Sequence, residues 1–219
     1  MKKRIRIILI ICVCIICGVC GYIGFRYQNT SARRLKDRYA SSIQQIHSLT
    51  DQDQDGIDDQ TDILQGALAY VSTKPDYQSR YYGTGYPDDG YGVCTDVVAN
   101  AMKDAGYDLM VLIQEDIAKN PEDYGITEPD MNIDFRRVRN LKVYFAHTAI
   151  SLTLDPSEIE QWQGGDIVIF KNHIGIVSDH RNKRGVPYVI HHSNPMQTAY
   201  EQDILESWDE IVGHYRISE

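Results

Sequence analysis

The sequence predicts an α+β fold in which helices pack on an antiparallel sheet, preceded by one N-terminal transmembrane helix. A long apolar run opens the chain, helical patterns fill the segment from 59 to 147, and short β-branched or aromatic runs separated by turns follow residue 150. Helices in the first part of a domain and strands in the second are characteristic of α+β proteins. At 219 residues, the chain has room for one domain and its appendages.

The transmembrane helix is predicted from the uncharged run between Ile7 and Phe25. At about 1.5 Å per residue, this run is long enough to cross a hydrocarbon core of about 30 Å. No Ala-x-Ala-like cleavage site follows it, and the residues before Cys17 and Cys20 match a lipoprotein signal poorly. We therefore expect residues 1–26 to form an uncleaved membrane anchor. Basic residues flank the run on both sides, so the positive-inside rule does not decide its orientation.

The charge balance excludes nucleic acid as a partner. Five of the 22 basic residues but none of the 31 acidic residues lie in the first 26 positions, which leaves a net charge of −14 in residues 27–219. Binding to phosphates needs clustered Lys and Arg side chains. We expect this part of the chain to act on a substrate that need not be an anion.

Two segments connect the anchor to the domain. Residues 27–50 are polar with apolar residues at helical spacing, which predicts a helical stalk or a linker. Residues 51–62 place carboxylates at positions 1, 3, 5, 9 and 12 and a glycine at position 6, the spacing of a calcium-binding loop. The ligands expected for a structural calcium ion are Asp51, Asp53, Asp55, the carbonyl of Ile57, Asp59 and Asp62. The loop resembles those of thrombospondin type 3 and dockerin-like repeats, and a solvated acidic linker that caps the next helix is the alternative.

Residues 63–219 form the predicted domain. The spacing of apolar residues predicts helices over 59–73, from Cys94 onward, around 108–118 and around 137–147. Glycines, tyrosines and a proline predict an irregular loop over 77–92. Short β-branched or aromatic runs predict strands over 166–170, 173–179, 187–191 and 214–217.

Cys94 is a candidate nucleophile. The other four cysteines all lie in the apolar run, so this thiol has no partner for a disulfide within the domain. It follows a glycine-rich turn and begins a predicted helix, where the helix dipole and a nearby histidine would favour the thiolate. A small buried apolar residue is the alternative role for a lone cysteine.

Two histidines are placed to serve this thiol. His173 opens a predicted strand and His191 ends the next one, so an antiparallel pair would bring them to one edge of the sheet. A cysteine, a base histidine and an orienting polar residue, in that order along the chain, is the arrangement of papain-like enzymes. For either histidine taken alone, a hydrogen-bonded strand residue is the alternative.

Several ordered motifs resemble those of the NlpC/P60 superfamily of cell-wall cysteine peptidases. They are Tyr-Gly-Thr-Gly at 82–85, Gly-x-Cys at 92–94 and the runs 165–170, 173–176 and 189–191. A closer resemblance is to the DUF1287 family, taken to lie within that papain-like clan, and it spans roughly residues 60–217. Its motifs occupy 92–98, 132–138, 173–179 and 213–216. The resemblance implies a papain-like α+β fold.

The resemblance also implies site roles. Cys94 corresponds to the nucleophile, His173 to the base and His191 to the residue that orients the imidazole, with Asp179 as a competitor for this third role. Tyr82 corresponds to the tyrosine near the oxyanion. Thr-Asp follows the cysteine where NlpC/P60 proteins commonly have Ser-Gly, and Asp96 either contacts a substrate amine or caps the helix.

The implied reaction is hydrolysis of an amide through a thioester, without a catalytic cofactor. The superfamily and the anchor point to bacterial cell-wall peptides as the substrate and to a catalytic domain on the extracytoplasmic side. Two other functions remain open: a non-catalytic wall-binding module of the same fold, and a peptidase or transferase that acts on a protein partner. The polar motif residues Asn132, Asp134, Arg136 and Arg137 are expected to form a structural hydrogen-bond network.

Overall fold

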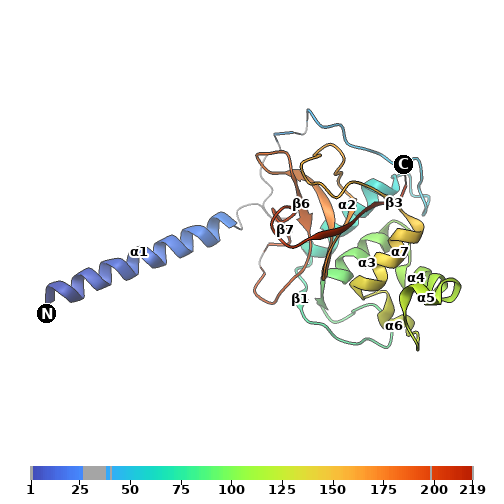
Figure 1. The fold of residues 1–219 in the computed structure, drawn as a ribbon, viewed down its shortest axis with the longest axis horizontal. Helices are drawn as coiled ribbons and strands as arrows, with labels where there is room; N and C mark the ends of the chain where they lie inside the picture. The colour runs from blue at the N-terminus through green and yellow to red at the C-terminus, as the bar shows by residue number, and fades with distance from the viewer. Residues whose placement is uncertain (1, 27–37, 40, 198, 219) are drawn as a thin grey trace.

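The computed structural model describes residues 2–26, 38–39, 41–197 and 199–218. Helix α1 (Lys2–Arg26) stands apart from the rest of the described chain (Figure 1). Its apolar side chains are exposed, for example Ile8 at 60% and Ile10 at 63%. By length and composition, Lys3–Gly24 could cross a membrane, which agrees with the helix expected over 7–25.

The domain is built on an antiparallel sheet. In the described residues, six strands lie in the order β3-β8-β4-β5-β6-β7, and every neighbouring pair is antiparallel. The strands are β3 (Ile150–Ser151), β4 (Ile167–Phe170), β5 (His173–Arg181), β6 (Pro187–Ile190), β7 (Glu201–Gln202) and β8 (Ile211–Arg216). The helix-then-strand order along the chain therefore folds as the predicted α+β class.

Both faces of the sheet are buried, which explains why β4 is apolar at every position. Ile167 and Ile169 face the main core beneath the helices. Val168 and Phe170 alternate with them and pack on the opposite face with Trp162. Loops between the C-terminal strands cover this second face.

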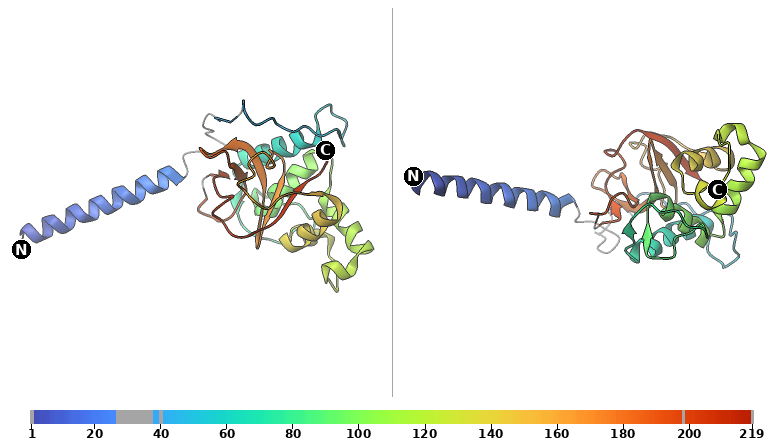
Figure 2. Two further views of the ribbon diagram at one scale, coloured as in Figure 1. Left: turned by 45° about the horizontal axis from the view of Figure 1, so that its top comes forward. Right: turned by 90° about the horizontal axis from the view of Figure 1, so that it is seen from below.

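Helices cover the first face of the sheet (Figure 2). Helix α2 packs against α3, and both contact β5. The more peripheral helices lie beside them, with α4 in contact with α5, α6 and α7. The helices are α2 (Asp59–Ser72), α3 (Cys94–Asp104), α4 (Leu109–Lys119), α5 (Pro121–Tyr124), α6 (Met131–Asp134) and α7 (Val138–Thr148).

The structure corrects two local predictions. Residues 41–50 are not helical but run along the domain in an irregular conformation, where the Ile46 N–H donates to Gln163 Oε1 over 3.4 Å. Residues 27–37 and 40 of the stalk or linker predicted over 27–50 lie outside the described residues. The loop over 77–92 is closed at its neck by a short parallel pair, β1 (Asp76–Tyr77) and β2 (Tyr91–Gly92). Such two-residue strands leave no periodic pattern from which to predict them.

Candidate active site

Cys94 is the first residue of α3, at the end of the helix that meets the sheet. Val93 before it is extended (φ −138°, ψ −176°), so the chain turns into the helix at the thiol. The side chain is partly exposed. Burial of the sulfur raises the pKa of the Cys94 thiol to about 11, although hydrogen bonds from the backbone of Ile174 and Thr95 act in the opposite direction. Ile174 follows His173, so Cys94 lies against the start of β5.

A buried ion pair holds this end of α3. Arg136 binds both carboxylate oxygens of Asp96, through Nε at 2.6 Å and Nη2 at 2.9 Å. Asp96 also accepts the Val93 N–H at 2.8 Å, which caps the helix. The carboxylate is fully buried. Of the two roles that the sequence left open for Asp96, the structure shows the capping one.

His173, His191 and Gln202 form a hydrogen-bonded chain across β5, β6 and β7. His173 Nε2 lies 2.9 Å from His191 Nδ1, and His191 Nε2 lies 2.9 Å from Gln202 Oε1. An amide oxygen can only accept, so His191 Nε2 carries the hydrogen and, in the neutral ring, Nδ1 does not. His191 Nδ1 therefore accepts from His173 Nε2, which leaves His173 Nδ1 as the basic nitrogen. The chain thereby selects one tautomer of His173.

Burial keeps the His173 imidazole neutral. Burial and the nearby positive charge of protonated His192 lower the pKa of His173 to about 4. The indole of Trp208 covers the ring at a centroid distance of 4.8 Å. With a thiol pKa near 11 and an imidazole pKa near 4, the resting pair is a neutral thiol and a neutral imidazole. The expected resting thiolate is thus not favoured here, because desolvation outweighs the helix N-terminus.

Comparisons with known proteins place the chain in a family. A family model described as "Domain of unknown function (DUF1287)" matches residues 64–217. The chain belongs to the DUF1287 family. It is similar to "Uncharacterized protein YijF" of Escherichia coli (strain K12), with 38% identity over 169 residues that cover 70% of this chain and 80% of the relative. No solved structure matches the chain. The relation of the DUF1287 fold to NlpC/P60 enzymes stays a prediction.

Two other candidates for supporting roles are Asp179, the competitor of His191, and Tyr82, the candidate for the oxyanion role. Asp179 is six positions beyond His173 on β5, about 20 Å along an extended strand, whereas His191 contacts His173 directly. The Tyr82 hydroxyl donates to Asp89 Oδ1 at 2.8 Å, inside the loop between β1 and β2. An oxyanion role for Tyr82 stays a prediction, because in this conformation its hydroxyl is engaged by Asp89.

The sequence did not predict three residues around this site. Gln202 lies on a two-residue strand, and Trp208 lies in the loop before β8. His192 packs edge-on against Tyr77 at 5.1 Å between ring centroids. The adjacent pair His191 and His192 was a signal in the sequence, whereas Gln202 carried none.

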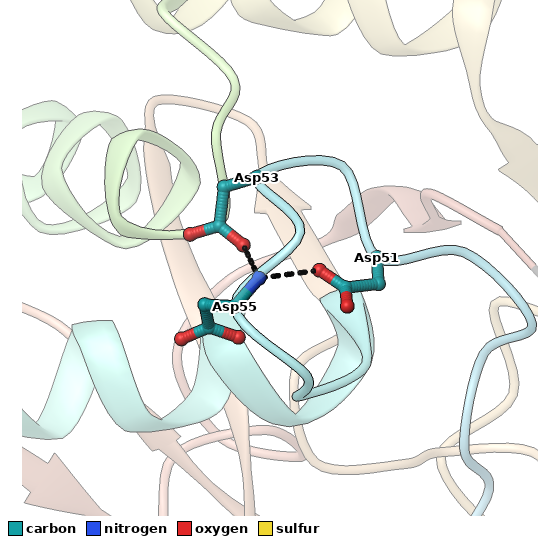
Figure 3. A group of neighbouring side chains, drawn as sticks. All are labelled: Asp51, Asp53 and Asp55. Carbon is teal, nitrogen blue, oxygen red and sulfur yellow. Dashed lines mark hydrogen bonds between the residues drawn. The ribbon is translucent and has the colours of Figure 1, made fainter.

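The acidic loop brings together three of its expected ligands. One carboxylate oxygen each from Asp51, Asp53 and Asp55 lies within 4.8 Å of the others, and Figure 3 shows the three side chains grouped in the loop before α2. Asp59 is not part of the group. Its oxygens accept from Gln52 N at 2.8 Å and Tyr107 Oη at 2.6 Å, so both are engaged by the protein, and its role as an ion ligand stays a prediction.

The network expected around the remaining motif residues is present. Asp134 accepts the Asp130 N–H at 2.7 Å, and its backbone carbonyl accepts from Asn140 at 2.9 Å. Arg136 additionally donates to the Arg80 carbonyl at 2.7 Å. Arg136 therefore connects the loop before Cys94, through Arg80, to the start of α3, through Asp96.

Proposed function

We propose that this DUF1287 protein is a membrane-anchored cysteine amidohydrolase that cleaves amide bonds in bacterial cell-wall peptides on the extracytoplasmic side. The observation that carries the proposal is the chain from His173 through His191 to Gln202, together with a thiol at a helix N-terminus that is hydrogen-bonded by the backbone of Ile174, the residue after His173. Burying three polar side chains in one ordered line is costly unless each is hydrogen-bonded. A module that only binds the cell wall has no need of such a chain.

The chemistry would begin with His173 Nδ1 taking the proton from Cys94 Sγ as the sulfur attacks the amide carbonyl carbon. Because both groups are neutral at rest, proton transfer and attack are coupled. The carbonyl oxygen gains the negative charge, and backbone N–H groups at the start of α3 are the nearest donors for it. The imidazolium then returns its proton to the leaving amine, which departs and leaves a thioester on Cys94.

The second half repeats these steps with water. His173 takes a proton from water, the oxygen attacks the thioester carbon, and the C–S bond breaks. The sulfur recovers its proton from the imidazolium, and a carboxylic acid leaves. Throughout, His191 Nδ1 accepts the Nε2–H of His173, which holds the ring and stabilises its positive form, and Gln202 Oε1 holds His191 by accepting its Nε2–H. The chemistry uses the protein's own groups and needs no catalytic cofactor.

The proposed location follows from α1. An exposed apolar helix of this length belongs in a bilayer and would keep the domain near the membrane surface. Cell-wall peptides lie just outside that surface, which is why the catalytic domain is proposed to face outward. The acidic balance of residues 27–219 is compatible with a peptide substrate that is not an anion.

The test is digestion of purified peptidoglycan by the full-length protein in detergent micelles, with mass analysis of the fragments. The wild type and Cys17→Ala, which removes a thiol of the anchor, should release the same products. Cys94→Ala should release none. If no amide bond is cut in a Cys94-dependent way, the amidohydrolase proposal fails for this substrate.

A further inference from the structure

The acidic loop between residues 51 and 62 is folded around its own carboxylates. Asp51 Oδ1 accepts the Asp55 N–H at 3.1 Å, and Asp51 Oδ2 accepts the Gly56 N–H at 3.0 Å. Gly56 turns the chain with φ +95°, a conformation that residues with a side chain rarely adopt. The result is a compact group of three carboxylates, those of Asp51, Asp53 and Asp55 (Figure 3).

A fourth carboxylate of the segment, Asp62, lies in the first turn of α2. Asp62 is 7% exposed, and its Oδ2 atom is buried without a hydrogen-bond partner in the described part of the chain. The carboxylates of Asp55, Asp53 and Asp51 are close enough to interact electrostatically with the Asp62 carboxyl. A buried, unpaired carboxylate oxygen next to three like charges is unfavourable unless a cation joins them.

The other two carboxylates of the segment serve the protein instead. Asp58 accepts from the N–H of Ser48 at 2.9 Å and from Thr61 Oγ1 at 2.7 Å. Asp59 accepts from Thr50, Gln52 and Tyr107. The six aspartates therefore divide into two that bind groups outside the loop and four at loop positions 1, 3, 5 and 12. Three of these four accept N–H groups of the loop's own backbone, and Asp62 has a buried oxygen without a partner in the described part of the chain.

We propose that Asp51, Asp53, Asp55 and Asp62 bind one Ca²⁺ ion, with the backbone carbonyl of Ile57 as a further ligand. Carboxylate and carbonyl oxygens suit hard cations. The absence of any nitrogen or sulfur atom from this ligand set argues against zinc or copper. Ca²⁺ accepts six to eight oxygens in flexible geometry, whereas Mg²⁺ requires a near-ideal octahedron and retains its water, so an exposed loop favours Ca²⁺.

The position of the loop indicates a structural effect on the domain. A methyl group built on Gly106, at the turn between α3 and α4, would lie 3.1 Å from Asp53 Cβ, so loop and turn are in close contact. Within the same segment, in the first turn of α2, Gln60 donates to the Gly164 carbonyl at 2.7 Å and to Asp166 at 2.9 Å. An ion in the loop would fix the start of α2 between these contacts and stabilise the packing of α2 on α3.

The test is calcium titration of the full-length protein in micelles, by calorimetry and by thermal unfolding. Wild type should bind one Ca²⁺, and its melting temperature should rise by about 5–10 °C when Ca²⁺ is 100-fold above the dissociation constant. Asp53→Asn and Asp62→Asn should each weaken binding at least about tenfold. The control Glu128→Gln removes one exposed charge outside the loop and should bind as wild type does.

One further outcome separates lost binding from misfolding. In chelator, Asp62→Asn should melt at the same temperature as wild type or higher, since it removes one of four mutually repelling charges. Calcium should then no longer raise that temperature. No saturable Ca²⁺ binding by the wild type, or wild-type affinity in both loop variants, would overturn the proposal. Preference for Mg²⁺ over Ca²⁺ would overturn the choice of ion.

Discussion

Replacing Gln202 with alanine should slow catalysis by about 5- to 150-fold while leaving the domain folded. The change removes the acceptor 2.9 Å from His191 Nε2 and leaves this N–H without a partner, on a ring that has no exposure to solvent. Leaving a buried donor unsatisfied costs about 1–3 kcal/mol, and each 1.4 kcal/mol of barrier is about tenfold in rate. Without that acceptor, His191 can carry its hydrogen on Nδ1 and donate it to His173 Nε2. The unprotonated nitrogen of His173 would then face His191 instead of Cys94.

Gln202→Glu is the matching conservative variant. A carboxylate accepts the same N–H, so it restores the tautomer and should recover most of kcat. Its negative charge also favours the protonated form of the histidines, so the acid limb of the rate profile should move from near pH 4 to higher pH. A residue with a purely structural role would not move this limb.

The assay is hydrolysis of a soluble cell-wall peptide by the full-length protein, with kcat and KM measured from pH 3 to 9. Gln202 does not reach the reacting atoms in this proposal, so kcat should fall and KM should stay near its wild-type value. The control for lost packing is Gln163→Ala, which replaces a buried glutamine remote from the histidine chain. This variant should have a lower melting temperature and an unchanged kcat.

Two results would refute this reasoning. One is a Gln202→Ala protein with wild-type kcat and pH profile, which would mean that the chain does not select the tautomer. The other is a loss of kcat that Gln202→Glu fails to recover, which would point to packing instead of hydrogen bonding.

Two further predictions concern stability. Folding stability should fall by several kcal/mol as pH drops from 6.5 to 4. Burial lowers the pKa of His173 and of His192 to about 4, so the unfolded chain binds protons at a higher pH than the folded chain does. Denaturant titrations that give a constant free energy of unfolding over this range would contradict the prediction. Arg136→Met should lower the free energy of unfolding by about 3–5 kcal/mol, because it leaves the buried Asp96 carboxylate unpaired. The side chain of Arg137 is 48% exposed, so Arg137→Met should lower it by under about 1 kcal/mol. Equal melting temperatures for the two variants would show that the buried pair does not contribute to stability.

Local patterns predicted the regular elements well. Apolar spacing placed α2, α3, α4 and α7, and β-branched runs placed β4, β5 and β6, because burial of one face or both leaves a period in the sequence. Irregular conformations left no such period. Residues 41–50 have helical spacing yet lie along the domain as an irregular strap, since contacts with the domain outweigh a weak helical preference.

The sequence by itself determined the apolar helix, the α+β class, the lone thiol at a helix start and the two histidines on neighbouring strands. Only the tertiary structure decided which polar groups meet. It placed Gln202 against His191 and paired Asp96 with Arg136. It also showed that Asp58 and Asp59 bind groups outside the acidic loop, whereas Asp62 has a buried oxygen without a partner in the described residues. The physical reason is distance along the chain: His191 and Gln202, or Asp96 and Arg136, meet through strand pairing and helix packing, for which spacing in the sequence carries no signal.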